Sequence, residues 1–268
     1  MAETTNEPTV HELFDLTGRT AIITGSTGHL GSSMARALAE AGGRVICTSR
    51  VEANAVEVAS RLPDPCGVKH VGLALDQMDS GSIDEFFGRA VAAAKSVDIL
   101  VNNGHEAIPG DWSTVTGDEF NRQLANVTGY FLLARLLRDH AVKRNAAASV
   151  ILLGSMYGLV ASYPDAYEGL CPASPAAYHA LKGGIVQLTR HLAAYWAKDR
   201  VRVNCLSPGP FPAPGVAPEL VERLETKLPL HRIGQPYELK GALLLLASDA
   251  GSYLTGHNLV VDGGWTAW

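Results

Sequence analysis

The sequence predicts an α/β protein whose helices cover both faces of one parallel sheet. Short apolar runs alternate with segments of helical periodicity along nearly all of its 268 residues. A glycine-rich loop follows the first apolar run, and neither a linker nor an internal repeat interrupts the alternation. Parallel strands joined by helices are buried on both faces, so their sequences are continuously apolar. We expect one domain over residues 13–268, preceded by a mobile N-terminal tail over residues 1–12.

The first elements are a strand, a glycine-rich loop, a helix and a second strand. The apolar run 20–23 leads into the loop 24–31, which reads Thr-Gly-Ser-Thr-Gly-His-Leu-Gly. An alanine-rich helix is expected over residues 32–41, ended by Gly42-Gly43, and the second strand over residues 44–48. This unit is typical of dinucleotide sites, because glycines let the backbone approach a pyrophosphate at the helix N-terminus.

The alternation continues to the C-terminus. Further strands are expected over residues 68–75, 97–101, 149–153, 201–204 and 258–261. Further helices are expected over residues 82–94, 119–140, a stretch that carries Tyr178 and ends near Lys198, and residues 238–248. Strands that alternate with helices in this way favour a parallel sheet over an antiparallel one.

Composition narrows the class of partner. Hydrophobic residues make up 47% and charged residues 18% of the chain, and the net charge is −5, which gives no reason to expect a nucleic acid or a membrane as partner. The four cysteines are widely spaced and form no Cys-x-x-Cys pair, so we expect reduced thiols, a cytoplasmic location and no metal site. No apolar run approaches the ~18 residues of a membrane span, and the polar first ten residues do not resemble a signal peptide.

Tyr178 and Lys182 are the strongest candidates for chemistry. They are four positions apart on a predicted helix, so both side chains lie on one face. A free tyrosine titrates near ~10, which is too high for ready proton exchange at neutral pH. A lysine charge within a few ångströms favours the phenolate, so we expect Lys182 to lower the pKa of Tyr178.

Together these motifs resemble the short-chain dehydrogenase/reductase family, in its single-domain branch, over nearly the whole chain. The matching residues are the loop 24–31, Asp98, Asn102-Asn103, Asn126, Ser155, Tyr178 with Lys182, Arg202-Val203-Asn204, Ser207-Pro208-Gly209 and Val261-Asp262-Gly263-Gly264. The resemblance implies a Rossmann-type, doubly wound sheet with three α/β/α layers. It also implies an NAD(P)(H)-dependent oxidoreductase that interconverts a secondary alcohol and a ketone.

The family's catalytic roles map onto four residues of this chain. By resemblance, Tyr178 is the general acid or base on the substrate oxygen, and Lys182 lowers its pKa and binds the nicotinamide ribose. Ser155 orients the substrate oxygen, and Asn126 holds a water that links Lys182 to solvent. The hydride belongs to the nicotinamide, so the protein supplies position and electrostatics.

The resemblance also implies a set of cofactor contacts. They are Gly25, Ser26, Thr27, His29, Leu30, Gly31, Ser49, Arg50, Asp76, Gln77, Asn103, Tyr178, Lys182, Pro208 and Phe211. No acid occupies the Ser49 position, where a carboxylate would repel a 2′-phosphate, and Arg50 follows it. We therefore expect NADP in preference to NAD, although Glu52 is close enough in sequence to neutralise Arg50.

The sequence departs from the family pattern in several places. His29 replaces a glycine of the loop, which then reads Thr-Gly-x-x-Gly-x-x-Gly, and His105 stands in the turn that usually reads Asn-Asn-Ala-Gly. Each histidine either contacts a ligand or is only a tolerated loop residue. Ser155 and Tyr178 are 23 positions apart, which is more than is usual. We expect substrate loops over residues 156–176 and 208–235, and the polar and aromatic groups of the first suit a sugar or sugar acid.

Two other functions remain open at this point. The glycine spacing resembles that of sugar-nucleotide epimerases and dehydratases, although the chain lacks the extra length that they need. A non-catalytic nucleotide-binding sensor is the second, since fold does not fix function.

The expected partners are a small-molecule substrate and further copies of the chain. The single-domain branch commonly forms a homotetramer, or else a homodimer. Apolar positions expected on the outer faces of two long helices are Leu133, Leu136, Ile185 and Leu188, and the chain ends in Trp265 and Trp268.

Overall fold

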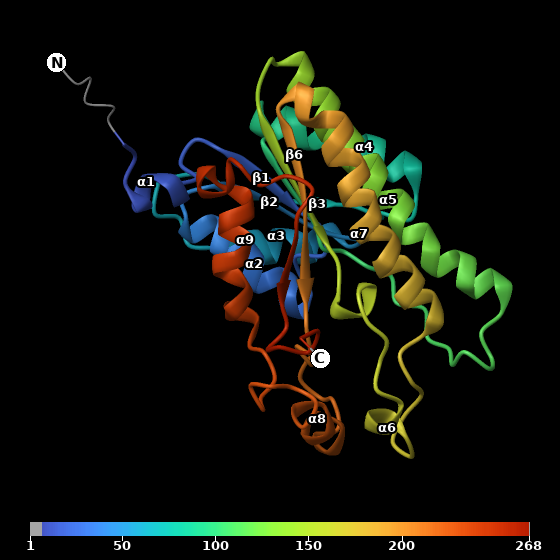
Figure 1. The fold of residues 1–268 in the computed structure, drawn as a ribbon. Coiled ribbons are helices and arrows are strands. Elements are labelled where there is room, and N and C mark those ends of the chain that lie inside the picture. Colours follow the sequence, from blue (N-terminus) through green and yellow to red (C-terminus); the bar gives the residue numbers. More distant parts are fainter. Residues whose placement is uncertain (1–6, 268) are drawn as a thin grey trace.

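The computed structural model describes residues 7–267 and contains one seven-stranded parallel sheet between two layers of helices (Figure 1). The strands stand in the order β3-β2-β1-β4-β5-β6-β7. Their bounds are β1 (Thr20–Ile23), β2 (Arg44–Ser49), β3 (Val71–Ala74), β4 (Ile99–Asn102), β5 (Ala148–Leu153), β6 (Val201–Pro208) and β7 (Asn258–Val261). The predicted doubly wound α/β fold is therefore confirmed.

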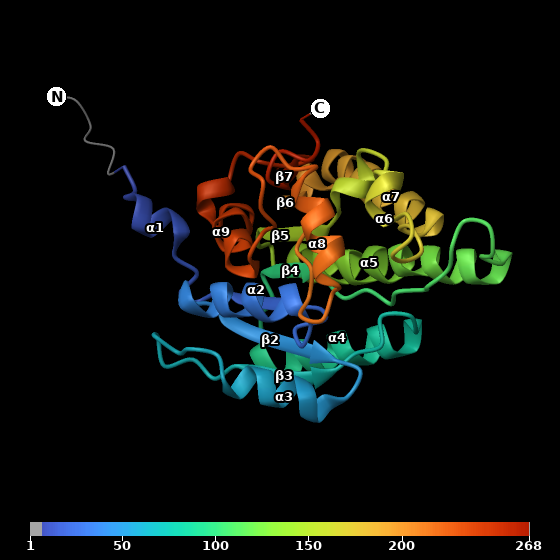
Figure 2. The same ribbon diagram turned by 90° about the horizontal axis from the view of Figure 1, so that it is seen from below.

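The helices form one layer on each face of the sheet (Figure 2). One layer holds α2 (His29–Glu40), α3 (Glu52–Ser60) and α9 (Lys240–Ala247). The other holds α4 (Ser80–Ala94), α5 (Gly117–Lys143) and α7 (Ala176–Trp196). Because successive side chains of a strand point to opposite faces, Ile22 packs on the second layer while Ala21 and Ile23 pack on the first.

The chain changes direction across the sheet between β1 and β4. The strands β2 and β3 extend from one side of β1, whereas β4 to β7 extend from the other. At such a switch point the loops after the two central strands separate and leave a crevice at their carboxyl ends. This is where the loop 24–31 and the turn after β4 meet.

The largest difference from the predicted elements lies at the N-terminus. Residues 1–6 lie outside the described residues, but residues 10–12 belong to helix α1 (Val10–Phe14) and not to a tail. Thr9 and Glu12 form a capping box, in which each side chain accepts a hydrogen bond from the backbone of the other. The expected tail over residues 1–12 is therefore wrong for its last part.

Most other predicted bounds agree with the structure within three residues. The helix α2 begins at His29, three residues before its predicted start, and α5 begins at Gly117 because Thr116 caps it with Glu119. Short helices were not predicted: α3, α6 (Pro164–Tyr167), α8 (Pro218–Glu225) and the 3-10 turns η1 (Met156–Gly158), η2 (Ala197–Asp199), η3 (Pro236–Leu239) and η4 (Asp249–Gly251). Within residues 7–267, no helix is long and apolar enough to cross a bilayer.

Some apolar positions expected to face outward are buried instead. Leu133 and Ile185 belong to the core between the sheet and the α4, α5, α7 layer, with at most 1% of each exposed. Leu136 and Leu188 are only partly buried. Trp265 is completely buried against its own chain, and Trp268 lies outside the described residues. The outer faces of α5 and α7 are thus less apolar than expected.

Candidate active site

A cavity of about 420 Å³ opens at the carboxyl ends of the central strands. It is lined by Thr24, Gly25, Thr27, Gly28, His29, Leu30, Gly31, Thr48, Ser49, Arg50, Leu75, Asp76, Gln77, Asn103, Gly104, His105 and Glu106. These residues come from the ends of β1, β2, β3 and β4 and from the first turn of α2. Ten of the predicted cofactor contacts are therefore brought to one cavity: Gly25, Thr27, His29, Leu30, Gly31, Ser49, Arg50, Asp76, Gln77 and Asn103.

The glycine loop is shaped by close backbone contacts. Gly25 has a φ of +63°, and a Cβ on it would lie 2.8 Å from the Cα of Gly104. A Cβ on Gly31 would lie 2.1 Å from the carbonyl oxygen of Gly25, so the start of α2 packs directly on the loop. The N-cap of α2 is Gly28, which offers no side chain to the first N–H groups of the helix. Those donors suit an anion such as the pyrophosphate of a dinucleotide, and the cavity fits this cofactor.

Thr24 and Asn103 connect the two central strands at this cavity. The Thr24 hydroxyl accepts hydrogen bonds from the backbone N–H groups of Asn103 at 2.9 Å and Gly104 at 2.7 Å. In return, the Asn103 amide donates to the carbonyl oxygens of Thr24 at 2.9 Å and Gly25 at 3.2 Å. The loop after β1 and the turn after β4 are thereby held at a fixed separation.

Three predicted cofactor contacts lie elsewhere. Ser26 is fully buried, and its hydroxyl donates to the Thr48 carbonyl and accepts from the Thr48 N–H, both at 3.1 Å. It therefore holds the loop against β2 instead of lining the cavity. Pro208 ends β6 and Phe211 packs against Gly234, and neither lines the cavity. The loop after β6 lies farther from the glycine loop than the prediction required.

The end of β2 carries a free positive charge. Ser49 and Arg50 line the cavity, and within residues 7–267 Arg50 forms no ion pair. Glu52, expected as a possible neutralising partner, accepts instead from the Arg89 guanidinium at 2.9 Å and from the Ala74 N–H at 3.3 Å. Arg89 holds the pKa of the Glu52 carboxyl below its usual value. Arg50 is thus available to an anionic ligand.

Tyr178, Ser155 and Lys182 lie together beside this cavity. Ser155 follows β5, is 7% exposed and caps η1 by accepting from the Tyr157 N–H at 3.1 Å. The Lys182 ammonium lies 5.5 Å from the centre of the Tyr178 ring and donates to the Leu153 carbonyl at 2.7 Å. One turn of α7 therefore places the phenol and the ammonium on the face that meets the end of β5.

Burial controls the titration of both groups. It lowers the pKa of Lys182 to about 8. It also raises the pKa of Tyr178, while Ser155, as hydrogen-bond partner of the phenol, acts in the opposite direction. The expected net lowering of the Tyr178 pKa by Lys182 is therefore wrong for this structure. Removing a phenolate from water costs more than the nearby lysine returns.

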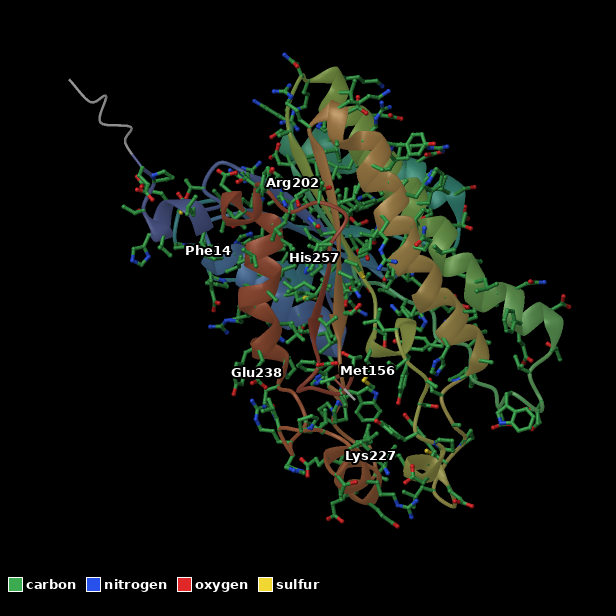
Figure 3. The ribbon with its side chains drawn as sticks, viewed as in Figure 1. Phe14, Met156, Arg202, Lys227, Glu238 and His257 are labelled. Atoms are coloured by element: carbon green, nitrogen blue, oxygen red, sulfur yellow. The ribbon has the colours of Figure 1, made fainter. Side chains whose placement is uncertain are left out.

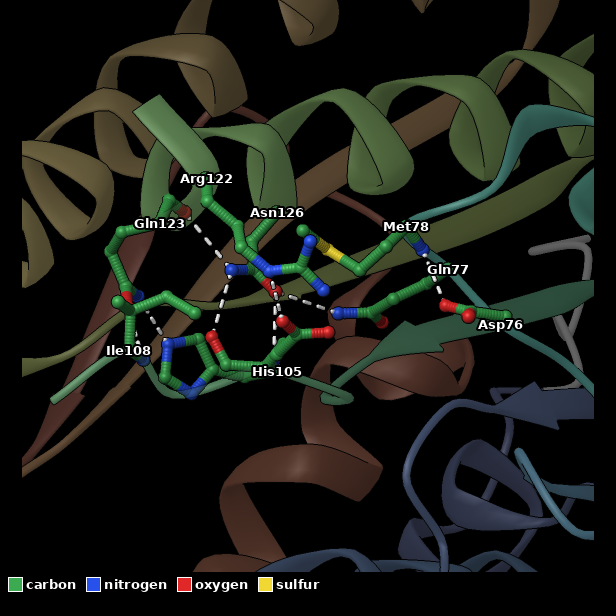
Figure 4. A network of polar contacts seen from close by, with 9 residues as sticks. Asp76, Gln77, Met78, His105, Ile108, Arg122, Gln123 and Asn126 are labelled. Carbon is green, nitrogen blue, oxygen red and sulfur yellow. Dashed lines mark hydrogen bonds and ion pairs between the residues drawn. The ribbon is translucent and has the colours of Figure 1, made fainter. Parts of the chain in front are cut away.

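Asn126 lies in a saturated network of hydrogen bonds (Figure 4). Its amide donates to the carbonyl oxygens of Glu106 at 3.0 Å and Gln123 at 2.9 Å. Its oxygen accepts from the Glu106 N–H at 2.8 Å and from the Gln77 amide at 3.0 Å. All four hydrogen-bonding positions of the Asn126 side chain are used, so the expected water cannot bind to that side chain without displacing a partner.

Gln77 explains one departure from the family turn. Its amide donates to the Gly104 carbonyl at 2.6 Å, and its oxygen lies where a Cβ on residue 104 would be, at a distance of 2.6 Å. An alanine at position 104 would push this side chain out of its hydrogen bonds. The glycine of Asn102-Asn103-Gly104 therefore fits the glutamine that approaches from β3.

The two unusual histidines both lie at the cavity. His29 is the first residue of α2 and lines the cavity wall. His105 also lines the cavity, and its ring meets the Tyr178 ring edge-on, with centroids 5.4 Å apart. Sequence reasoning left His105 open between a ligand contact and a surface position. Its replacement of a turn glycine was the signal that pointed to it.

The two expected substrate loops contact each other at one end of the molecule. Lys227 of α8 forms an ion pair with Asp165 of α6, and Arg223 donates to the Glu168 carbonyl at 2.7 Å. Figure 3 shows Lys227 at the same end of the molecule as Met156, which follows β5. Tyr163 packs edge-on against Trp265, with centroids 5.1 Å apart. The segments 156–176 and 208–235 thus close one side of the region beside Tyr178.

This fold and this site define a class, the dinucleotide-dependent oxidoreductases. Comparison with known proteins is more specific. A family model described as "Enoyl-(Acyl carrier protein) reductase", of the short-chain dehydrogenase type, matches residues 26–266. The chain is 36% identical to galactitol 2-dehydrogenase (L-tagatose-forming) of Cereibacter sphaeroides, over 96% of this chain and 98% of the relative. It is 33% identical to D-arabinitol 2-dehydrogenase (ribulose-forming) of Scheffersomyces stipitis, over 95% of this chain and 96% of the relative.

Solved structures agree with these relatives. The fold matches a gluconate 5-dehydrogenase from Burkholderia cenocepacia in complex with NADP and tartrate, with a TM-score of 0.87, 29% identity and coverage of 97% and 100% of the two chains. A short-chain type dehydrogenase/reductase from Mycobacterium marinum has the same TM-score of 0.87 at 30% identity, over 97% of this chain and 100% of that one. The protein belongs to the short-chain dehydrogenase/reductase family. It is an NAD(P)-dependent alcohol dehydrogenase or ketone reductase, as the resemblance implied.

The buried ammonium of Lys182 predicts an unusual pH dependence of stability. The unfolded chain keeps this proton up to a pKa near 10.5, whereas the folded protein loses it at about 8. Between these values the unfolded state binds more protons, so the free energy of unfolding rises with pH. Relative to Lys182→Met, the wild type should gain about 3 kcal/mol between pH 8 and 10.5 in chemical denaturation, from ~1.4 kcal/mol per pKa unit.

The comparison with Lys182→Met removes the contribution of the tyrosines, which titrate in both proteins. Parallel stability curves for the two proteins over this range would show that Lys182 keeps an ordinary pKa.

Proposed function

We propose that the protein interconverts a secondary alcohol and a ketone on a polyol, sugar or sugar acid, with a nicotinamide cofactor. The observation that carries the proposal is the group formed by Ser155, Tyr178 and Lys182 at one end of the dinucleotide cavity. The substrate class is supported by relatives that act on D-arabinitol and galactitol, and by polar and aromatic groups on the segment 156–176.

Each member of the group has a role that fits its surroundings. Tyr178, whose phenol is protonated at neutral pH because burial raises its pKa, donates a proton to a ketone oxygen or accepts one from an alcohol. Ser155 orients that oxygen, and Lys182 supplies a positive charge at a short distance. Asn126 positions the turn after β4 through its two bonds to Glu106. A bound nicotinamide would supply or accept the hydride.

The test is a panel of polyols, sugar acids and ketoses with both cofactors, followed through the absorbance of the reduced nicotinamide. Turnover of at least one vicinal diol supports the proposal, and inactivity on the whole panel contradicts it. A sugar-nucleotide epimerase would instead retain its cofactor through turnover, so denatured purified protein would release nicotinamide. The dehydrogenases above match the chain over nearly their whole length, which favours the dehydrogenase over the epimerase or a non-catalytic sensor.

Tyr178→Phe should abolish turnover and leave cofactor binding within a few-fold of wild type. The variant keeps the ring and removes only the acid/base group, so kcat falls by at least ~10²-fold, the usual contribution of general acid–base catalysis. Steady-state kinetics and cofactor titration by fluorescence measure the two effects. Tyr253→Phe, at a fully exposed tyrosine, is the control and should keep wild-type activity. Turnover by Tyr178→Phe at a tenth of the wild-type rate or better would refute the assignment.

We propose NADP(H) as the preferred cofactor. Ser49 leaves room for a 2′-phosphate at the end of β2, and Arg50, which Glu52 does not neutralise, offers a charge-assisted contact. The structure from Burkholderia cenocepacia is a complex with NADP, which agrees with this preference.

Ser49→Asp should reverse the cofactor preference. The added carboxylate repels a 2′-phosphate and accepts hydrogen bonds from a ribose 2′-hydroxyl. The measurement is the ratio of kcat/KM for NADP to that for NAD. This ratio should exceed one in wild type, fall below one in Ser49→Asp and fall about tenfold in Arg50→Ala, the loss of one charge-assisted contact. A wild type that already prefers NAD would contradict the argument.

We also propose a homotetramer, or else a homodimer, in the cytoplasm. The partly buried apolar side chains Phe131, Leu136, Leu188 and Trp196 on α5 and α7, together with the exposed Tyr195, are the surface that supports it. The four cysteines Cys47, Cys66, Cys171 and Cys205 are all unpaired, which suits a reducing compartment. Light scattering at micromolar concentration should give a multiple of the 28.4 kDa chain mass, and a monomer mass would remove the assembly proposal.

A further inference from the structure

His105 occupies the point where the dinucleotide cavity meets Tyr178. Its ring lines the cavity and lies edge-on to the Tyr178 ring, with 5.4 Å between centroids and 73° between planes. A group in this place lies within reach of a substrate whose oxygen contacts Tyr178. The chemistry that His105 offers depends on which ring nitrogen carries the proton.

Gln123 determines that tautomer. The backbone N–H of Ile108 donates to Oε1 of Gln123 at 2.8 Å, which fixes the orientation of the amide. The NH₂ group of the amide therefore faces Nε2 of His105, at 2.6 Å (Figure 4). An amide NH₂ can only donate, so Nε2 of His105 is the acceptor and the ring proton resides on Nδ1.

Nδ1 remains available to a ligand. Within residues 7–267 the side chain of His105 forms a hydrogen bond only with Gln123. Nδ1 is also not among the fully buried side-chain atoms without a partner, which belong to Gln77, Asn102, Tyr130 and Trp265. Its N–H is therefore open to the cavity that the ring lines.

The ring is held in place and held neutral. Asn126 binds both the N–H and the carbonyl of Glu106, the next residue, and Gln123 is 1% exposed on α5. Burial and then the charge of Lys182 lower the pKa of His105 to about 4. Near the ring the other ionisable groups are Tyr178 on α7 and the ion pair of Glu106 with Arg122. A neutral, fixed N–H donor results.

We propose that His105 is a specificity-determining residue whose Nδ1–H donates to a substrate hydroxyl on the carbon next to the reacting one, and that Gln123 positions it by fixing its tautomer. A neutral donor suits an uncharged hydroxyl oxygen, and the histidine replaces a glycine, which offers no such group. The inference rests on the proposed alcohol–ketone chemistry and assigns the feature of the substrate that the site recognises.

Two ketones that differ only in this hydroxyl test the proposal: 3-hydroxy-2-butanone and 2-butanone, each reduced with NADPH. Wild type should favour the hydroxyketone in kcat/KM by about tenfold, the worth of one good hydrogen bond. His105→Leu should lose this preference through the hydroxyketone alone. His105→Asn, whose amide keeps a donor near the position of Nδ1, should retain part of it. Since 2-butanone reports any damage to Tyr178, the ratio isolates recognition of the hydroxyl.

Gln123→Glu is the matched test of the tautomer. One carboxylate oxygen can still accept from Ile108, while the other faces His105 as an acceptor in place of a donor. The ring pKa then rises, and above that pKa the single proton resides on Nε2, so Nδ1 no longer donates. The preference of this variant should be lost at high pH and return at low pH, whereas that of wild type should be constant from pH 6 to 9.

The outcomes separate this inference from the proposed function. A wild type that oxidises polyols but reduces the two ketones equally, or reduces neither, overturns the role of His105 and leaves the proposed function intact. A preference that survives in His105→Leu, or that stays independent of pH in Gln123→Glu, also overturns it. Inactivity on the polyol panel removes the proposed function itself.

Discussion

The hydrogen bonds between Thr24 and Asn103 are the contact on which the rest of the site depends. They join the ends of β1 and β4, the two strands at which the order of the sheet reverses. A cavity at such a point needs both loops at a defined separation, because one loop presents the helix terminus and the other leads to the catalytic helices. Each partner both donates and accepts, so neither loop can shift without breaking contacts on both strands.

Burial has the same effect on three groups around the reacting position, since it favours the neutral form of each. It raises the pKa of Tyr178 and lowers those of Lys182 and His105. The three remain distinct because they start from different ordinary values. Near neutral pH Tyr178 is a proton donor, Lys182 keeps its positive charge and His105 carries none, so the protein is prepared for the direction in which a ketone receives a proton.

The sequence predicted the sheet, the large helices and the place of the catalytic residues, because these follow from apolar periodicity and from short motifs with fixed spacing. It did not predict α6 and α8, whose formation depends on contacts between segments far apart in the chain, such as Arg223 with Glu168. The burial of Ser26 was also missed, since a hydroxyl in a loop is equally suited to a ligand or to a neighbouring strand. The Tyr178 pKa was predicted in the wrong direction because desolvation depends on packing that no local motif encodes.

The pairing of Gln77 with Gly104 limits the order in which this site can change during evolution. The glutamine oxygen fills the space that a side chain on residue 104 would take, and its amide holds the same turn through the Gly104 carbonyl and Asn126. An alanine that arises first at position 104 meets an occupied volume and disrupts the turn that carries His105. A smaller residue that arises first at position 77 makes the same alanine acceptable. The two positions are therefore historically contingent, and a lineage could regain the family's usual turn by one mutational order and not by the other.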